Sequence, residues 1–136
     1  LPDARASLHG ASLSNFTREN MARAVIEGTL VSQVAMLDAL TACGLSVERL
    51  LLIGGAASSP AVQSILTELV DTPVVLPEFD EYVTKGAALQ AACALDGDFP
   101  HWSVDFEVMP QLSADGRAAA QHASAMAALG YLDGAG

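Results

Sequence analysis

The middle of the chain contains the stretch LLLIGGAASSP, residues Leu50–Pro60. Four consecutive apolar residues followed by two glycines are typical of a strand that is buried on both faces and then turns sharply. Ser59 followed by Pro60 is the favoured order at the start of a helix, because an amide at the first helical position has no partner to lose. The stretch therefore predicts a buried strand over residues 47–53, a turn without side-chain bulk, and a helix.

The residues after Pro60 continue this pattern. Apolar residues recur at the spacing of one helix face, which predicts a helix that buries that face. These residues are Val62, Ile65, Leu66, Leu69 and Val70. Residues 74–76 then read Val-Val-Leu between two prolines. They predict a short strand near a sheet edge, because proline donates no hydrogen bond to a neighbouring strand. A polar loop is predicted over residues 78–81.

A long helix is predicted before the stretch, from Thr17 to about Cys43. Thr17 is a suitable N-cap, and Gly44 stands where a left-handed closing residue is needed. The helix is apolar almost all round, which is typical of a helix covered on two sides, and a chain this short is not expected to supply both covers by itself. Gly28 lies in its middle, where glycine is unfavourable, so we expect a close backbone approach there.

Two further helices are predicted after the second strand. The first runs from about Val83 to Leu95 and consists almost wholly of small residues, and the second runs from about Ala114 to Leu129. Between them, aromatic residues at Phe99, Trp102 and Phe106 are expected to cover the edge of a core. This order of helices and strands indicates the α/β class. Two strands are too few for a stable sheet, so its first strands are expected to be missing from this chain.

Composition narrows the possible functions. The chain has 136 residues, of which 51% are hydrophobic, and this fits one globular domain. Six basic residues against sixteen acidic ones give a net charge of -10, which disfavours nucleic acids and anionic membrane surfaces as partners. The unbroken apolar runs are shorter than the roughly 20 residues that span a bilayer, and residues 1–10 do not resemble a secretion signal. We therefore expect a cytoplasmic protein.

Neither the cysteines nor the histidines form a recognisable site. Cys43 and Cys93 are far apart and lie in apolar helical stretches, which predicts two small buried side chains without a disulfide. His9, His101 and His122 share no spacing with each other or with the cysteines. No metal site and no catalytic triad are predicted.

The turn after Ile53 is the one segment with a ligand-binding mechanism. It follows the carboxyl end of a buried strand and leads into a helix whose free amide groups face the turn, and ligands bind at such places in open α/β sheets. A nucleotide is the natural ligand for it. The spacing fits neither a Gly-x-Gly-x-x-Gly fingerprint nor a phosphate-binding Walker loop, so an ordinary tight turn remains the alternative.

Four segments in the right order resemble the C-terminal domain of FGGY-family carbohydrate kinases, and most closely the xylulokinases. They are Leu1–Gly10, Arg23–Gly28, Leu52–Ser58 and Glu81–Ala88. The resemblance implies a partial actin-like (ribonuclease-H-type) ATPase domain, with helices packed on a mixed sheet. Residues 1–97 would be the rear part of the nucleotide-binding domain, and residues 98–136 a C-terminal extension ending in a helix.

The resemblance also implies the roles of particular residues. Gly54, Gly55 and Ala56 would line the nucleotide, with Ser58 or Ser59 near the base. Family members phosphorylate a sugar hydroxyl with Mg-ATP, using a catalytic aspartate and a phosphate loop that precede these segments. No residue of this chain matches either part, so we assign no catalytic and no metal-binding residue here. Phosphoryl transfer needs both parts, and a chain without them is expected to be inactive alone.

The Arg23–Gly28 segment has a structural role by the same resemblance. Glu27 and Gly28 would pack the long helix beside the nucleotide pocket. The implied partners are ATP, a pentulose such as D-xylulose, Mg²⁺ held outside this chain, and an N-terminal kinase domain. The alternative is a non-catalytic module that uses exposed apolar faces to form a homodimer or larger oligomer. A dehydrogenase of the Rossmann type is disfavoured, because its glycine fingerprint is absent.

Overall fold

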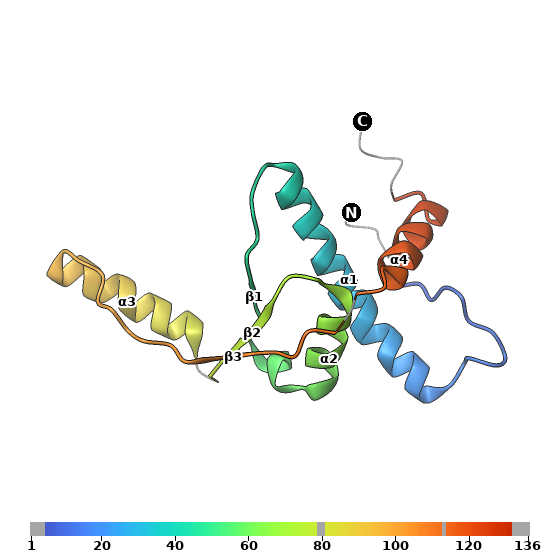
Figure 1. Ribbon diagram of the computed structural model, residues 1–136, viewed down its shortest axis with the longest axis horizontal. Coiled ribbons are helices and arrows are strands. Elements are labelled where there is room, and N and C mark those ends of the chain that lie inside the picture. Colours follow the sequence, from blue (N-terminus) through green and yellow to red (C-terminus); the bar gives the residue numbers. More distant parts are fainter. Residues whose placement is uncertain (1–4, 79–80, 113, 132–136) are drawn as a thin grey trace. The chain divides into compact units, whose positions relative to one another are not determined.

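The computed structural model describes residues 5–78, 81–112 and 114–131. The chain divides into two compact units, one formed by Leu1–Leu45 with Asp115–Gly136 and the other by Ser46–Ala114. The first unit contains two helices, α1 and α4 (Figure 1). The second contains helices α2 and α3, the short 3-10 helix η1, and strands β1, β2 and β3.

Helix α1 covers Arg18–Ala42, and its ends are those that the sequence predicts. The Thr17 hydroxyl accepts a hydrogen bond from the Asn20 amide at 3.2 Å, which caps the first turn. At the other end Gly44 has a φ of 82°. Its amide donates to the Thr41 carbonyl at 2.9 Å, and the Leu45 amide donates to the Leu40 carbonyl at 3.1 Å. These two bonds form a Schellman motif, so the predicted cap and closing glycine are confirmed.

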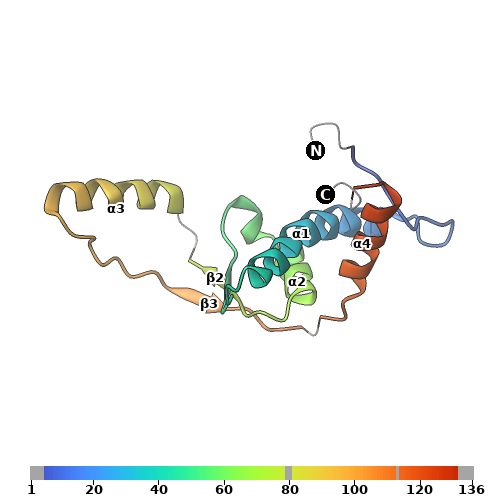
Figure 2. The same cartoon turned by 90° about the horizontal axis from the view of Figure 1, so that it is seen from above.

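Helix α4 covers Arg117–Ala128 and lies beside α1, which both views show (Figure 2). It begins after Gly116, three residues later than predicted, because Gly116 has a φ of 67° that an α-helix does not contain. The segment before α1 forms a loop around Asn15. The Asn15 side chain accepts a bond from the Ser12 amide at 2.7 Å and donates one to the Gly10 carbonyl at 2.9 Å.

One expectation for α1 is wrong in the described chain. A Cβ atom at Gly28 would have no heavy atom within 4 Å, so nothing approaches the backbone closely there. Only Leu30 and Val31 are buried on α1, whereas Val25 is 69% and Met36 62% exposed, so the described chain does not cover the helix on two sides, as expected of a chain this short. By length and composition α1 is also apolar enough to cross a membrane, a test that core helices of other proteins pass as well. Polar residues scattered along the helix interrupt its apolar runs. The length of the longest unbroken run therefore does not reveal this property.

The second unit is built on a three-stranded mixed sheet in the order β1-β2-β3. Its elements are β1 Leu50–Leu51, η1 Gly55–Ser58, α2 Pro60–Leu69, β2 Val74–Pro77, α3 Tyr82–Asp96 and β3 Phe106–Val108. β1 runs parallel to β2, with Leu50 opposite Val74, and β3 runs antiparallel to β2, with Val108 opposite Val75. The predicted α/β class and mixed sheet are confirmed.

The sheet corrects three predictions about the strands. β2 is the central strand and not an edge strand, because Pro73 precedes it and Pro77 ends it, so neither proline interrupts its middle. β3 is a third strand, in a segment for which an irregular covering loop is predicted. β1 is shorter than predicted and is not buried on both faces, since Leu51 is 56% exposed at the edge of the sheet.

The core of this unit lies between α2 and the sheet. The predicted apolar face of α2 is confirmed: Ile65, Leu66 and Val70 are buried, and Val62 and Leu69 are half-buried. The buried side chains of the core are Ala57, Ile65, Leu66, Val70, Val74 and Val75. Val74 on the central strand is 0% exposed. This packing fixes α2, and with it the turn before α2, against the carboxyl end of β1.

Helix α3 ends as predicted, at Gly97 with a φ of 83°, whose amide donates to the Cys93 carbonyl at 2.8 Å. None of the residues of α3 is buried. The loop predicted at 78–81 falls partly outside the described residues, at 79 and 80.

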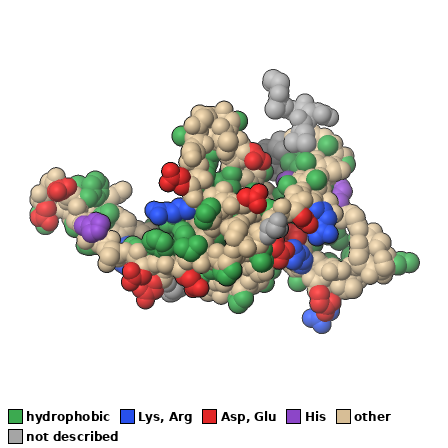
Figure 3. Space-filling view, viewed as in Figure 1, with side chains coloured by type: hydrophobic (Ala, Val, Ile, Leu, Met, Phe, Trp, Pro, Cys, Tyr) green, Lys and Arg blue, Asp and Glu red, His purple; other side chains and the backbone are tan. Residues whose placement is uncertain are grey.

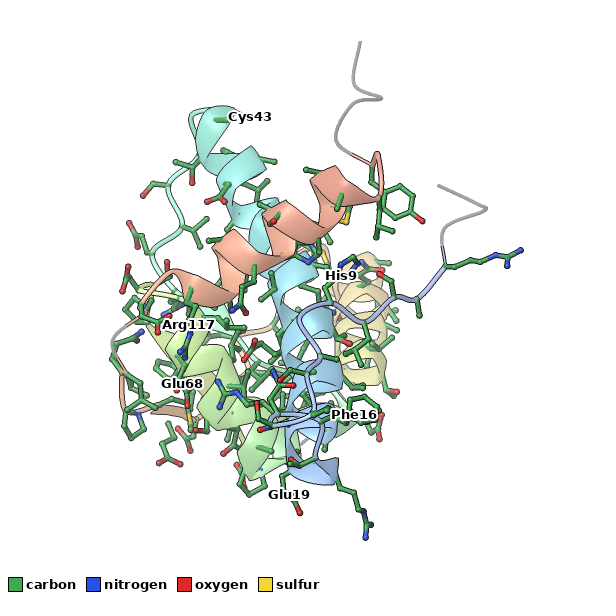
Figure 4. All side chains as sticks on the ribbon, turned by 90° about the vertical axis from the view of Figure 1, so that its right-hand side faces the viewer. His9, Phe16, Glu19, Cys43, Glu68 and Arg117 are labelled. Carbon is green, nitrogen blue, oxygen red and sulfur yellow. The ribbon has the colours of Figure 1, made fainter. Side chains whose placement is uncertain are left out.

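Both cysteines are less buried than predicted. Cys43 is exposed just beyond the end of α1 (Figure 4), and Cys93 on α3 is half-buried. Their helices were predicted correctly, but the apolar neighbours of each cysteine in sequence do not surround it in space. The prediction of two buried thiols is therefore wrong.

Candidate functional site

The turn after β1 has the backbone geometry that its two glycines suggest. Gly54 has a φ of 96° and a ψ of 175°, a combination open essentially only to glycine. Residues Gly55–Ser58 follow as one turn of 3-10 helix, closed by a 3.0 Å bond from the Ala57 amide to the Gly54 carbonyl. The backbone therefore reverses within a few residues and delivers the chain to α2.

Three consecutive amides of this turn have no partner. In the part of the chain that the structure describes, no group accepts a hydrogen bond from the amide nitrogen of Gly54, Gly55 or Ala56. The first amides of any helical turn lack an acceptor within that turn, and here no side chain caps them. Such amides are donors for the oxygen atoms of a ligand.

The two serines of the predicted site behave differently. The Ser58 hydroxyl donates to the Gly55 carbonyl at 2.9 Å and so braces the 3-10 turn. Ser59 occupies the N-cap position of α2, as predicted, but its side chain makes no capping hydrogen bond. Its carbonyl accepts from the Gln63 amide at 3.1 Å. The Ser59 hydroxyl remains available to a ligand.

A cavity of about 170 Å³ lies beside this turn. Its walls come from the turn, from the end of β2 and from the start of α3. The lining residues are Leu52, Ile53, Gly54, Ala57, Ser58, Leu76, Pro77 and Tyr82. Of the predicted site residues, Gly54 and Ser58 line the cavity, while Gly55, Ala56 and Ser59 lie on the same turn outside its lining.

Sequence reasoning missed the far wall of this cavity, formed by Leu76, Pro77 and Tyr82. The parallel pairing of β1 with β2 brings the carboxyl ends of both strands to one edge of the sheet. A β-α-β order with a short helix between the strands is the signal that could have indicated this pairing. Tyr82 is the first residue of α3, and its hydroxyl donates to the Glu78 carbonyl.

The cavity is apolar, and none of the described residues in its lining carries a carboxylate. Its residues offer only the hydroxyls of Ser58 and Tyr82 and main-chain groups as polar partners. Among the described residues no cluster of His, Cys, Asp and Glu side chains is suited to hold a metal ion. The turn can thus bind and orient a ligand, but these residues supply neither a general base nor ligands for a cation.

The Arg23–Gly28 segment lies in the other unit and is described by itself. The Arg23 Nε atom is 3.0 Å from Oε2 of Glu27, one turn along α1. Two further cavities in that unit, of about 130 and 490 Å³, are lined by the segment before α1 together with α1 or α4. Neither contains a residue of the predicted site.

Comparisons with known proteins show which family this chain is similar to. Residues 1–95 match the model of the FGGY family of carbohydrate kinases, C-terminal domain. The chain is 35% identical to xylulose kinase of Haemophilus influenzae over 94 residues, which cover 69% of this chain and 19% of that protein. It is 31% identical to glycerol kinase of Bacillus velezensis over 114 residues, which cover 83% of this chain and 22% of that protein.

The likeness extends to a solved structure. The crystal structure of xylulose kinase from Bifidobacterium adolescentis superimposes with a TM-score of 0.74 and 38% sequence identity, over 91% of this chain and 25% of that chain. This coverage reaches beyond residue 97, into the expected C-terminal extension. The chain thus spans about a fifth to a quarter of the length of these relatives. By its sequence and by its fold, the chain belongs to the FGGY family of carbohydrate kinases, as their C-terminal domain.

Proposed function

We propose that this chain supplies the adenosine-binding half of the active site of an ATP-dependent sugar kinase. Residues 1–97 act as the rear part of the nucleotide-binding domain, and residues 98–136 as its C-terminal extension. The reaction belongs to the whole protein, of which a segment of this length forms about a fifth to a quarter in the relatives. The partner within that protein is an N-terminal kinase domain.

The observation that supports this role is the row of unpartnered amides on Gly54, Gly55 and Ala56. ATP carries ribose and phosphate oxygens that accept hydrogen bonds from such amides, and the absence of side-chain bulk allows close contact. The same turn also carries Ser59, whose hydroxyl is free, and Ser58, which lines the adjoining cavity. ATP, when bound, supplies the phosphoryl group, and these residues hold and orient its nucleoside part.

The catalytic base and the ligands of Mg²⁺ lie outside this chain in the proposed enzyme. In the part of the chain that the structure describes, no carboxylate lines the cavity beside the turn. Phosphoryl transfer depends on positioning the attacking hydroxyl and neutralising the charge that develops on the phosphate. The turn does neither, so the chain by itself binds ATP weakly and does not turn it over.

We propose a pentulose, D-xylulose, as the sugar, in a cytoplasmic pathway of xylose metabolism. Xylulose kinases from two organisms are 35% and 38% identical to this chain, which supports that choice. Gluconokinase of Bacillus subtilis, at 33% identity, and glycerol kinase of Bacillus velezensis, at 31%, are also similar, so the assay compares all three substrates.

The test is an ADP-release assay with ATP and D-xylulose, glycerol or gluconate in turn. We expect no turnover by residues 1–136 alone and turnover of D-xylulose by the polypeptide that joins them to an N-terminal kinase domain. If the enzyme turns over glycerol or gluconate in preference to D-xylulose, the proposed substrate is wrong. Turnover by residues 1–136 alone would overturn the argument about the missing catalytic parts.

A second candidate is a non-catalytic module that assembles through apolar surfaces. It is supported by the exposure of Leu51, Phe106 and Val108 on the sheet, each more than half exposed. Hydrophobic side chains are visible over the strands in Figure 3. Light scattering at micromolar concentration separates the candidates in part: a dimer or larger oligomer is required by the second and is merely allowed by the first.

A further inference from the structure

We infer that Tyr82 is the residue that holds the nucleotide base, through contact with its aromatic ring. This inference rests on the proposed function and assigns a role to a residue for which the resemblance to the family gives none. Tyr82 is the first residue of α3 and lines the same cavity as Gly54 and Ser58, although it comes much later in the chain.

The volume of the cavity limits which part of a nucleotide can enter it. Pockets that enclose a whole drug-sized ligand measure about 300–1,000 Å³. The cavity beside the turn measures about 170 Å³, so it has room for one ring system and not for a complete nucleotide. The base therefore enters the cavity, while the ribose and the phosphates stay outside, along the amides of Gly54–Ala56.

The chemistry of the walls agrees with a planar aromatic ligand. Leu52, Ile53, Leu76 and Pro77 form apolar surface. Among the described residues of the lining, Tyr82 is the aromatic one, and it is half-buried. Aromatic side chains stack on bases of every type, because each base has a π face. The described lining of the cavity thus offers one aromatic ring for stacking and an apolar surface around the base.

The hydroxyls in the lining are already engaged. Tyr82 donates its hydroxyl proton to the Glu78 carbonyl, and Ser58 donates its own to the Gly55 carbonyl. The bond to Glu78 also fixes the orientation of the tyrosine ring at the start of α3. What Tyr82 can offer a ligand is therefore its ring, and replacing tyrosine by phenylalanine should preserve most of the contact.

The experiment measures steady-state kinetics of the full-length kinase, the polypeptide in which we propose that these residues work. For Tyr82→Ala we expect the KM for ATP to rise about tenfold, equivalent to about 1.4 kcal/mol, with kcat and the KM for the sugar unchanged. Tyr82→Phe should stay within about twofold of the parent enzyme, since the ring remains. The matched control is Val83→Ala, the next residue on α3, which is 86% exposed and lines no part of the cavity.

Inorganic triphosphate separates base binding from loosening of the whole site. It lacks a base, so its inhibition constant against ATP should be the same in Tyr82→Ala as in the parent enzyme. If both triphosphate inhibition and the KM for ATP weaken, or if the KM for ATP does not change, the assignment of Tyr82 is wrong. Tyr82→Leu repeats the test with a side chain that fills the cavity, should the alanine variant fail to fold. Failure of the parent enzyme to use ATP would instead overturn the proposed function.

Discussion

The side-chain amide of Gln63 donates a 2.7 Å hydrogen bond to the main-chain carbonyl of Ala57. Ala57 is 6% exposed and belongs to the 3-10 turn, whereas Gln63 lies on the first turns of α2. The bond therefore ties the candidate site to the helix that packs on the sheet. It satisfies a carbonyl that the backbone of the turn leaves without a partner.

Removing this bond should loosen the turn measurably. Gln63→Leu keeps a side chain of similar length but leaves the Ala57 carbonyl unsatisfied, so we expect the free energy of unfolding to fall by about 1–3 kcal/mol. Urea denaturation checks this. The control is Gln90→Leu on the exposed surface of α3, which should stay within about 0.5 kcal/mol. Equal effects of the two substitutions would show that the Gln63 bond contributes nothing to stability.

The two glycines of the turn should respond differently to alanine. Gly54 has a φ of 96°, so Gly54→Ala forces a strained backbone and should lower the free energy of unfolding by about 1–3 kcal/mol. Gly55 is its matched control, because its φ is not positive and a Cβ there would have no heavy atom within 4 Å. Gly55→Ala should be close to neutral. Calorimetric unfolding of both variants gives the comparison, and a neutral Gly54→Ala would contradict the described turn.

The sequence was most informative where a single residue type determines a backbone state. Thr17, Gly44 and Gly97 mark helix ends that the structure contains, because capping side chains and left-handed glycines act locally. The apolar face of α2 was also predictable, since helical spacing alone identifies it. The bare amides of the turn followed from its glycines.

Features that depend on pairing between distant segments were not predictable in this way. β3 is three residues long with Glu107 in its middle, and it exists because it pairs with β2 across some 30 residues of chain. The central position of β2 depends on such pairing as well. Tyr82 lines the cavity because the parallel pairing of β1 and β2 brings the carboxyl ends of both strands to one edge of the sheet. Cys43 was expected to be buried from its apolar neighbours, yet the end of α1 leaves it exposed.

Substitution of Gly28 tests whether another backbone lies close to the middle of α1. In the described chain no atom lies near the position of its Cβ, so Gly28→Ala should stabilise the chain of residues 1–136 by about 1 kcal/mol through helix propensity. Thermal unfolding measures this as a higher Tm. A lower Tm would mean that another backbone approaches Gly28 closely, as a glycine in the middle of a helix suggests.

The exposed edge of the sheet should govern self-association. Leu51 lies on the edge strand β1 and is 56% exposed, and charged residues on an edge discourage pairing with a second chain. We expect Leu51→Lys to lower the mass measured by light scattering if residues 1–136 associate. Leu95→Lys, at an 85% exposed position on α3, is the control and should leave the mass unchanged. The opposite ranking of the two variants would place the contact on α3.

The most direct test of the nucleotide site is a crystal structure of the full-length kinase with a non-hydrolysable ATP analogue. We predict that oxygen atoms of the nucleotide lie within hydrogen-bond distance, about 2.7–3.2 Å, of the amide nitrogens of Gly54, Gly55 or Ala56. A nucleotide bound elsewhere, with those three amides facing water or protein, would contradict it.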